Sequence, residues 1–168
     1  MASLHSQLLI LILITLLPFF ELRASIPLGI VSGSVNLPFG YTLSGFGLPW
    51  YLVFIIVVVT NIFLGMAVYL IIQEFIHLFL KIKIFNKFYQ HYSKNVYEKI
   101  NKYTEKYGKW GLMIFIGLPV PGSGSYSGAL AAHLIGLSFK KFVVANALGV
   151  LIAGTLVTLL TLGIIKLF

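Results

Sequence analysis

Two charged residues stand beside a long apolar run, and their side chains are the first candidates for chemistry. Glu21 and Arg23 follow the apolar residues 8–17 and lie between Pro18 and Pro27. Charges inside a membrane segment are costly, so each should bind a partner or serve a function. Residues two apart do not face each other on a helix, so we expect separate partners. Arg23 could bind a phosphate or carboxylate through its planar guanidinium, and Glu21 could carry a coupling proton. The alternative is a structural role, in which the two charges only hold the turn.

A second turn, at residues 119–128, offers backbone groups instead of charge. Gly122 and Gly124 allow close approach to the backbone. A helix beginning near Ser125 would direct free N–H groups and the positive end of its dipole at the turn, which makes a natural anion site. The alternative is packing, because Gly124 and Gly128 have the spacing of a small-residue helix crossing. The remaining candidates in this turn are Pro119, Pro121, Ser123 and Tyr126.

Three further polar residues lie within apolar segments: Asn61, Asn146 and His133. They could line a cavity, but we favour hydrogen bonding between packed helices as their role. The chain contains no Asp and no Cys, and its only acids are four Glu. It therefore has no Ser–His–Asp set and no thiolate metal site. We expect no enzyme activity, no bound metal and no cofactor.

The composition indicates which solvent surrounds these residues. Of 168 residues, 59% are hydrophobic and 10% are charged, whereas a soluble domain is about 25% charged. A soluble fold of this size could not bury so much apolar surface, so we predict an integral membrane protein, located in the cell (plasma or inner) membrane.

One basic segment carries most of the net charge of +8, because eight lysines fall between positions 81 and 109. The positive-inside rule places this linker in the cytoplasm. Apolar and aromatic residues recur there at steps of three and four, which predicts an amphipathic helix against membrane lipids. Nucleic-acid binding is not expected, because topology and anionic headgroups already account for the lysines.

The apolar parts divide into short and long segments. The run 8–17 is about 15 Å long as a helix, half the hydrocarbon core. We therefore predict a re-entrant hairpin at 8–34 with its turn from Pro18 to Pro27, an external loop at 35–49 and a transmembrane helix at 50–80. A secretory signal peptide is one alternative for the first run, but no Lys or Arg precedes it. A simple spanning helix at 8–31 is the other, but it would place both charges at depth and contain two prolines. After the linker, we predict a second hairpin at 110–137 and a transmembrane helix at 142–165.

The two halves, 1–80 and 110–168, follow the same order of elements. Val59-Thr60-Asn61 also matches Val144-Ala145-Asn146, with a glycine soon after each. The fold class we predict is all-α, with two inverted repeats that each contain a re-entrant hairpin and a long transmembrane helix. Such repeats with broken segments are typical of secondary transporters.

Two motifs resemble a known family. Residues 21–27 have the sequence E-L-R-A-S-I-P, which is similar to the E-L-R-G-A-I-P signature of the small multidrug export family. Residues 119–130, P-V-P-G-S-G-S-Y-S-G-A-L, resemble its second signature, P-x-P-G-T-G-A-W-T-G-A-L. The resemblance extends to the DedA/VTT superfamily, and it implies inverted re-entrant hairpins, dimers, and the movement of lipid-linked phosphates or phospholipids.

The sequence therefore predicts a small secondary transporter or a lipid or lipid-phosphate flippase, with its site between the two turns. Proton or ion coupling through Glu21 and a homodimer belong to this hypothesis. The alternative is a non-transporting assembly or lipid-organising protein that acts through the basic linker at 81–109.

Overall fold

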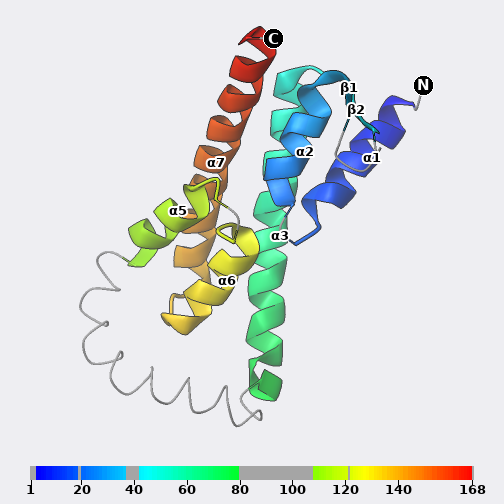
Figure 1. Ribbon diagram of the computed structural model, residues 1–168. Coiled ribbons are helices and arrows are strands. Elements are labelled where there is room, and N and C mark those ends of the chain that lie inside the picture. Colours follow the sequence, from blue (N-terminus) through cyan, green and yellow to red (C-terminus); the bar gives the residue numbers. More distant parts are fainter. Residues whose placement is uncertain (1–2, 19, 37–41, 80–107, 121, 168) are drawn as a thin grey trace.

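The computed structural model describes residues 3–18, 20–36, 42–79, 108–120 and 122–167 (Figure 1). Within these ranges it is mostly helical, as predicted. The elements are α1 (Leu4–Thr15), α2 (Glu21–Ile30), β1 (Ser32–Asn36), β2 (Thr42–Phe46), α3 (Trp50–Phe79), α5 (Lys109–Gly117), α6 (Ser125–Leu134) and α7 (Phe139–Leu167). The predicted amphipathic linker helix at 81–109 lies outside the described residues, except for its last two positions.

Two long apolar helices, α3 and α7, form the frame of the molecule. Their sequences contain no proline, so nothing interrupts the backbone ladder. Both have an apolar stretch long enough to cross a membrane, at Trp50–Phe75 and Phe139–Gly163. The helix predicted at 142–165 begins three residues earlier, at Phe139. Figure 1 shows that α3 and α7 run in opposite directions and that the chain ends near the start of α3.

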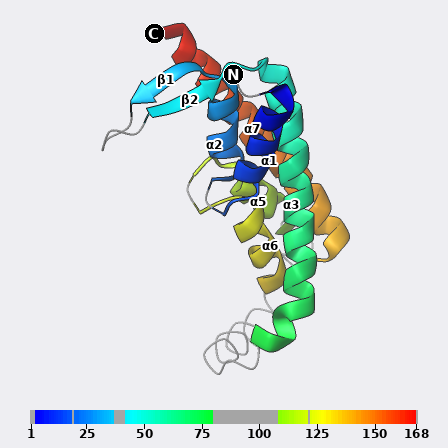
Figure 2. The ribbon, with the colours of Figure 1, turned by 90° about the vertical axis from the view of Figure 1, so that its right-hand side faces the viewer.

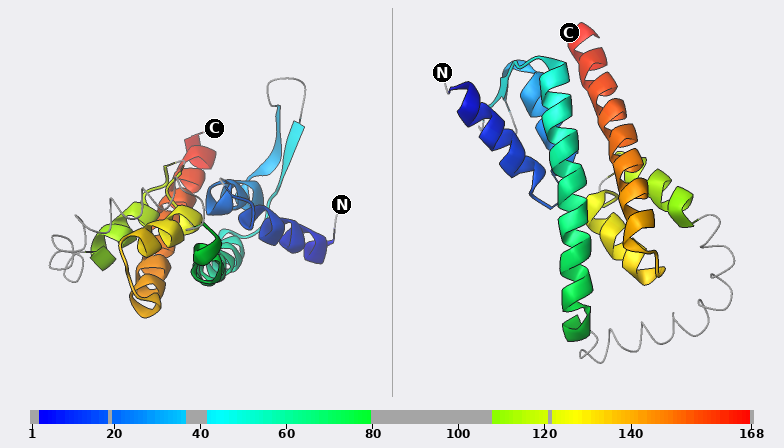
Figure 3. Two further views of the ribbon diagram at one scale, coloured as in Figure 1. Left: turned by 90° about the horizontal axis from the view of Figure 1, so that it is seen from below. Right: turned by 180° about the vertical axis from the view of Figure 1, so that it is seen from behind.

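Two pairs of short helices pack against this frame. The break between α1 and α2 and the break between α5 and α6 lie at the same level, near the middle of α3 (Figure 1). The pair α1 and α2 reaches this level from the end of the molecule where α3 begins, and α5 and α6 reach it from the other end. Seen from behind, α6 lies between α3 and α7 (Figure 3). Segments far apart in sequence therefore meet at mid-height.

The first break is shorter than predicted. We expected an irregular segment from Pro18 to Pro27, but α2 begins at Glu21 and contains Pro27. Proline removes one backbone N–H donor and leaves the later bonds of the helix intact. The Val31 N–H accordingly donates to the Pro27 carbonyl at 2.9 Å. Pro27 is thus part of a helix and not of the turn.

The predicted external loop at 35–49 contains strand structure instead. Strands β1 and β2 form an antiparallel hairpin in which Ser32 pairs with Phe46 and Asn36 with Thr42. A segment rich in Gly and Ser has few side chains to bury, and pairing satisfies its backbone donors and acceptors. The Leu48 N–H also bonds to the Gly29 carbonyl at 2.9 Å, which ties the hairpin to the end of α2. The hairpin projects sideways from the helices (Figure 2).

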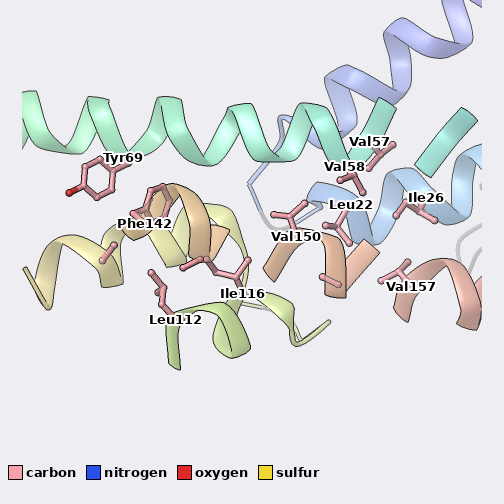
Figure 4. Close-up of a cluster of buried hydrophobic side chains, with 14 of the residues drawn as sticks. Leu22, Ile26, Val57, Val58, Tyr69, Leu112, Ile116, Phe142, Val150 and Val157 are labelled. Atoms are coloured by element: carbon pink, nitrogen blue, oxygen red, sulfur yellow. The ribbon is translucent and has the colours of Figure 1, made fainter. Parts of the chain in front are cut away.

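The core lies where α2, α5 and α6 contact the two long helices (Figure 4). Ile116 of α5 is wedged between two glycines, Gly128 of α6 and Gly149 of α7. A Cβ atom on either glycine would lie 2.6 or 2.7 Å from Ile116 side-chain atoms. Small residues therefore set the close spacing of these three helices, as they do at helix crossings within membranes.

Large apolar side chains cover much of the outer surface of the long helices. Phe63 on α3 is 64% exposed and Leu159 on α7 is 62% exposed. Contiguous apolar surface of this kind is rare on soluble monomers, and a bilayer would cover it.

Candidate functional site

The site begins with Glu21, the first residue of α2, which is 4% exposed. Its backbone has φ of +41°, the only positive φ at a described residue other than glycine. This conformation costs a non-glycine residue roughly 1–3 kcal/mol and is found where the surroundings over-determine it. A chain of hydroxyls supports the strained turn: Thr15 donates to Ser25 at 2.8 Å, and Ser25 donates to the Glu21 carbonyl at 2.8 Å.

The Glu21 carboxylate binds the N-terminus of α6, which is more than 100 residues away in sequence. Its Oε2 accepts from the Ser125 N–H at 3.2 Å, and its Oε1 accepts from the Tyr126 N–H at 3.3 Å. These are two of the N–H groups that a helix leaves unpaired at its start. The predicted anion site at this helix end is thus occupied by a carboxylate of the chain itself.

Gly124 leaves the space that this contact needs. A Cβ atom at position 124 would lie 2.5 Å from Glu21 Oε2 and 2.8 Å from Oε1. The close approach predicted for this glycine is thus an approach of the Glu21 carboxylate to the backbone.

Arg23 binds the other half-helix of the second break. Its Nη2 donates to the Leu118 carbonyl at 3.1 Å, to the Ser123 hydroxyl at 2.9 Å and to the Ser123 carbonyl. Leu118 is the C-cap residue that follows α5, so Arg23 meets a carbonyl at the negative end of the α5 dipole. The Nε atom of Arg23 is buried without a hydrogen-bond partner.

The two charges have separate partners, and each has the sign that suits the helix end it meets. The negative Glu21 faces the positive end of the α6 dipole, and the positive Arg23 faces the negative end of the α5 dipole. The first turn of α2 thereby supplies a side-chain partner to both helix ends that flank the second break.

Asn61 and Asn146 lie on the two long helices beside this contact, and both are fully buried. Asn61 Nδ2 donates to Glu21 Oε2 at 3.3 Å. Asn146 accepts from the Ser125 hydroxyl at 2.9 Å and donates to the Ile62 carbonyl of α3 at 3.2 Å. The two amides therefore attach the broken helices to the frame.

Comparison with known proteins now places the chain. A family model described as "Putative small multi-drug export protein" matches residues 21–156. The chain belongs to this family. No curated protein and no solved structure matches it. The matched region begins at Glu21, the first residue of α2, and includes the second break and most of α7. Together with the two apolar helices, membership of this export family indicates a membrane protein.

Tyr126 of α6 also contacts the end of α1. Its hydroxyl donates to the Leu16 carbonyl at the end of α1, at 2.6 Å, while its N–H binds Glu21. Tyr126 therefore joins α6 to both helices that flank the first break.

Replacing Tyr126 with Phe should lower the free energy of unfolding by about 0.5–1.5 kcal/mol, the usual net value of one hydrogen bond. The ring and the N–H contact to Glu21 remain in this variant, so the effect isolates the hydroxyl. Chemical unfolding of the protein in detergent measures it, with Tyr51→Phe on the exposed start of α3 as the matched control. Equal stability of the two variants would contradict the contact.

His133 lies at the far end of α6 and does not reach the breaks. Its ring stacks on Tyr69 with centroids 4.2 Å apart, and its Nε2 lies 3.0 Å from the Tyr69 carbonyl oxygen. The Tyr69 hydroxyl donates to the Leu137 carbonyl at 2.7 Å. This cluster holds the C-terminal end of α6 against α3, so the histidine has a packed, hydrogen-bonded position.

The other candidates divide into those at the contact and those beside it. Ser123 is at the contact through Arg23, and its hydroxyl also lies 2.6 Å from the Leu118 carbonyl oxygen. Pro18 and Pro119 flank the breaks, and Gly122 turns the chain with φ of +89°. Pro121 lies outside the described residues.

Sequence reasoning missed three residues that support the site. Thr15 and Ser25 form the hydroxyl chain behind Glu21, and Gly65 of α3 makes room for the Asn146 amide. Isolated Ser, Thr and Gly are common in membrane helices, so composition alone does not distinguish these three. The spacing of Gly65 four residues after Asn61 was the available signal.

Proposed function

We propose that the protein is a small secondary transporter or lipid-phosphate flippase whose substrate site lies between the two breaks. The observation that carries the proposal is a pair of opposite charges, Glu21 and Arg23, that bind the ends of α6 and α5. This contact lies at mid-height between the two long apolar helices. Ionisable residues at membrane depth mark transport pathways by default. Breaks that face each other there are typical of transporters with inverted repeats.

In this proposal the short helices are re-entrant hairpins. Helices α1 and α2 have 12 and 10 residues, which gives about 15–18 Å each, roughly half of the hydrocarbon core. The pairs approach mid-height from opposite ends (Figure 1), which supports inverted repeats and a place near the DedA/VTT superfamily. Irregular backbone at that depth needs cover by protein, and α3 and α7 supply it.

In this proposal, the gate of the transporter is the set of hydrogen bonds that Glu21 and Arg23 make to the ends of α6 and α5. An anionic substrate group, such as a phosphate, would compete with the Glu21 carboxylate for the N–H groups of Ser125 and Tyr126. Proton uptake by Glu21 would remove its charge and weaken its hold on α6. Arg23, released from the α5 carbonyls, would then be available to bind the anion.

Transport by the purified protein in vesicles tests this function. We expect the wild type to move a fluorescent short-chain phosphatidic acid between leaflets, driven by a pH gradient. Glu21→Gln cannot take up the coupling proton, and Arg23→Ala has no guanidinium with which to bind the anion, so each variant should lower the rate roughly tenfold or more.

Glu74→Gln and Lys140→Ala are the matched controls, because both side chains are exposed and far from the breaks in sequence. Wild-type rates in both site variants would remove Glu21 and Arg23 from the mechanism. Ethidium, a cationic dye, is the second probe; efflux of the dye without movement of the lipid would exclude the anionic substrate class.

The topology in the cell membrane has its own prediction. Because the chain has no native Cys, single cysteines report their side of the membrane directly. Ser93→Cys in the linker should react with an impermeant maleimide only from the cytoplasm, and Ser44→Cys only from outside. Labelling of both from one side would contradict the inverted arrangement.

A further inference from the structure

The side-chain amide of Asn61 makes a hydrogen bond through its NH₂ group, while its oxygen has no hydrogen-bond partner. The side chain is fully buried. Its Nδ2 donates to the Glu21 carboxylate at 3.3 Å, while its Oδ1 has no hydrogen-bond partner. A buried carbonyl oxygen left in this state costs about 1–3 kcal/mol. Such a cost at a fully buried position calls for a reason, because most buried polar atoms are paired.

The second half of the chain shows the same arrangement with every partner in place. Ser125 is the first residue of α6, as Glu21 is the first residue of α2. Each contacts an asparagine in the long helix that follows. In the second half, the Ser125 hydroxyl donates to Asn146 Oδ1 at 2.9 Å, and Asn146 Nδ2 has an acceptor of its own.

The two halves differ in whether the group that faces the asparagine carries a hydrogen that it can donate. Ser125 carries an O–H and can donate to an amide oxygen, whereas an ionised carboxylate only accepts. Asn61 therefore turns its NH₂ toward Glu21 and leaves its oxygen unpaired. A protonated Glu21 carboxyl would carry an O–H, as Ser125 does, and could supply the missing donor.

We propose that Asn61 is a positioning residue that switches its amide orientation with the protonation of Glu21. With Glu21 ionised, the Asn61 NH₂ donates to the carboxylate. When Glu21 takes up a proton from water, the amide turns over and Asn61 Oδ1 accepts the new carboxyl O–H. No covalent bond other than this O–H forms or breaks. This inference rests on the proposed coupling role of Glu21.

The switch connects proton uptake to the second break. Ionised Glu21 holds the N–H groups of Ser125 and Tyr126 by charge-assisted hydrogen bonds, which are roughly twice as strong as neutral ones. A neutral carboxyl bound to Asn61 would make weaker hydrogen bonds to these N–H groups and would lose its attraction to the α6 dipole. Asn61 thereby stabilises the state in which α6 is released.

The other groups around the Glu21 carboxyl are few. Among the described residues, the Glu21 charge acts on two titratable side chains, Arg23 of α2 and Tyr126 of α6. From α1 and α2, Thr15 and Ser25 support only its backbone carbonyl. The Tyr126 hydroxyl is engaged with Leu16, whereas the unpaired Asn61 Oδ1 is placed to accept a hydrogen bond from the carboxyl O–H.

Infrared spectroscopy of the full chain in lipid tests the switch. Four Glu and no Asp give few carboxyl bands, and the Glu21 band is the one that Glu21→Gln removes. A carboxyl whose O–H is donated absorbs at a lower wavenumber than a free one. We therefore expect the band of protonated Glu21 to move to a higher wavenumber in Asn61→Leu.

Thr158→Val is the matched control, because Thr158 is also a buried polar residue with an unpaired oxygen. The band should stay in place in this variant. An unmoved band in Asn61→Leu, or a Glu21 that never protonates while the protein stays folded, would overturn the proposal.

A second measurement avoids any substitution at Asn61. With ¹³C at the side-chain carbonyls of asparagine, acidification of the wild type should shift one amide band to a lower wavenumber. The shift should be absent in Glu21→Gln. A missing shift in the wild type overturns the switch even if vesicles transport normally, whereas a failed transport assay with both band shifts present would count only against the proposed function.

Discussion

Gly124→Ala should lower the free energy of unfolding by about 2–4 kcal/mol and reduce vesicle transport to a tenth of the wild-type rate or less. The added Cβ would lie 2.5 Å from Glu21 Oε2, so the carboxylate must leave the N-terminus of α6. Two hydrogen bonds to backbone N–H groups are then lost, and a buried charge loses its compensation. The substitution thus separates Glu21 from α6 without changing either charged residue. In the proposed mechanism, proton uptake by Glu21 then no longer controls the release of α6, so the rate of proton-driven transport falls.

Gly111→Ala is the control for this prediction. Gly111 lies in α5, and nothing is within 4 Å of where its Cβ would be. Alanine is favoured over glycine inside a helix by up to about 1 kcal/mol, so the control should be as stable as the wild type or slightly more. Thermal unfolding in detergent and the phosphatidic acid assay provide the two readouts. Gly124→Ala with wild-type stability would mean that the carboxylate does not occupy this helix end.

The sequence was sufficient to predict the frame of the fold. Long apolar runs without proline predicted α3 and α7 to within a few residues, because nothing in them competes with the helix. The start of α6 near Ser125 was also predicted, since a glycine-rich turn precedes an apolar run. The hairpin at 32–46 was not, because segments rich in Gly and Ser have weak strand preference and pair only in context.

The sequence singled out the two charged residues of the candidate site but not the groups that they contact. Glu21 and Arg23 stood out because charges are rare in apolar segments. Their partners are backbone groups of Leu118, Ser125 and Tyr126, and every residue has such groups, so no residue type could indicate them. Pro27 was assigned to the turn for the opposite reason: its residue type is conspicuous, yet the helix continues through it.

This difference changes the hypothesis about the anion site. The sequence predicted an anion site for a substrate at the N-terminus of α6. In the structure that helix end binds Glu21, and the predicted anion anchor, Arg23, binds carbonyls. In the proposed transporter, a substrate must therefore replace contacts that already exist, so substrate binding and opening would occur as one event. The strained backbone of Glu21 favours this reading, because relief of strain would accompany release.

Gly65→Ala should lower the free energy of unfolding by about 2–4 kcal/mol, although alanine is the better helix former by up to about 1 kcal/mol. The Cβ would lie 2.5 Å from Asn146 Nδ2 and 2.7 Å from its Oδ1. The amide must move, which leaves the buried Ser125 hydroxyl and the amide itself unpaired, at about 1–3 kcal/mol for each group. Two such losses outweigh the gain in helix propensity.

A double-mutant cycle separates this mechanism from general crowding of α3. Asn146→Ala removes the amide that Gly65 accommodates, so Gly65→Ala should cost at least about 1 kcal/mol less in that background than in the wild type. Gly163→Ala on α7, where nothing is within 4 Å, should be neutral or slightly stabilising. If Gly65→Ala were as harmless as Gly163→Ala, Asn146 could not lie against α3, and the attachment of the second break to the frame would need another explanation. If the cost were the same in both backgrounds, it would come from the helix crossing itself and not from the amide that anchors Ser125.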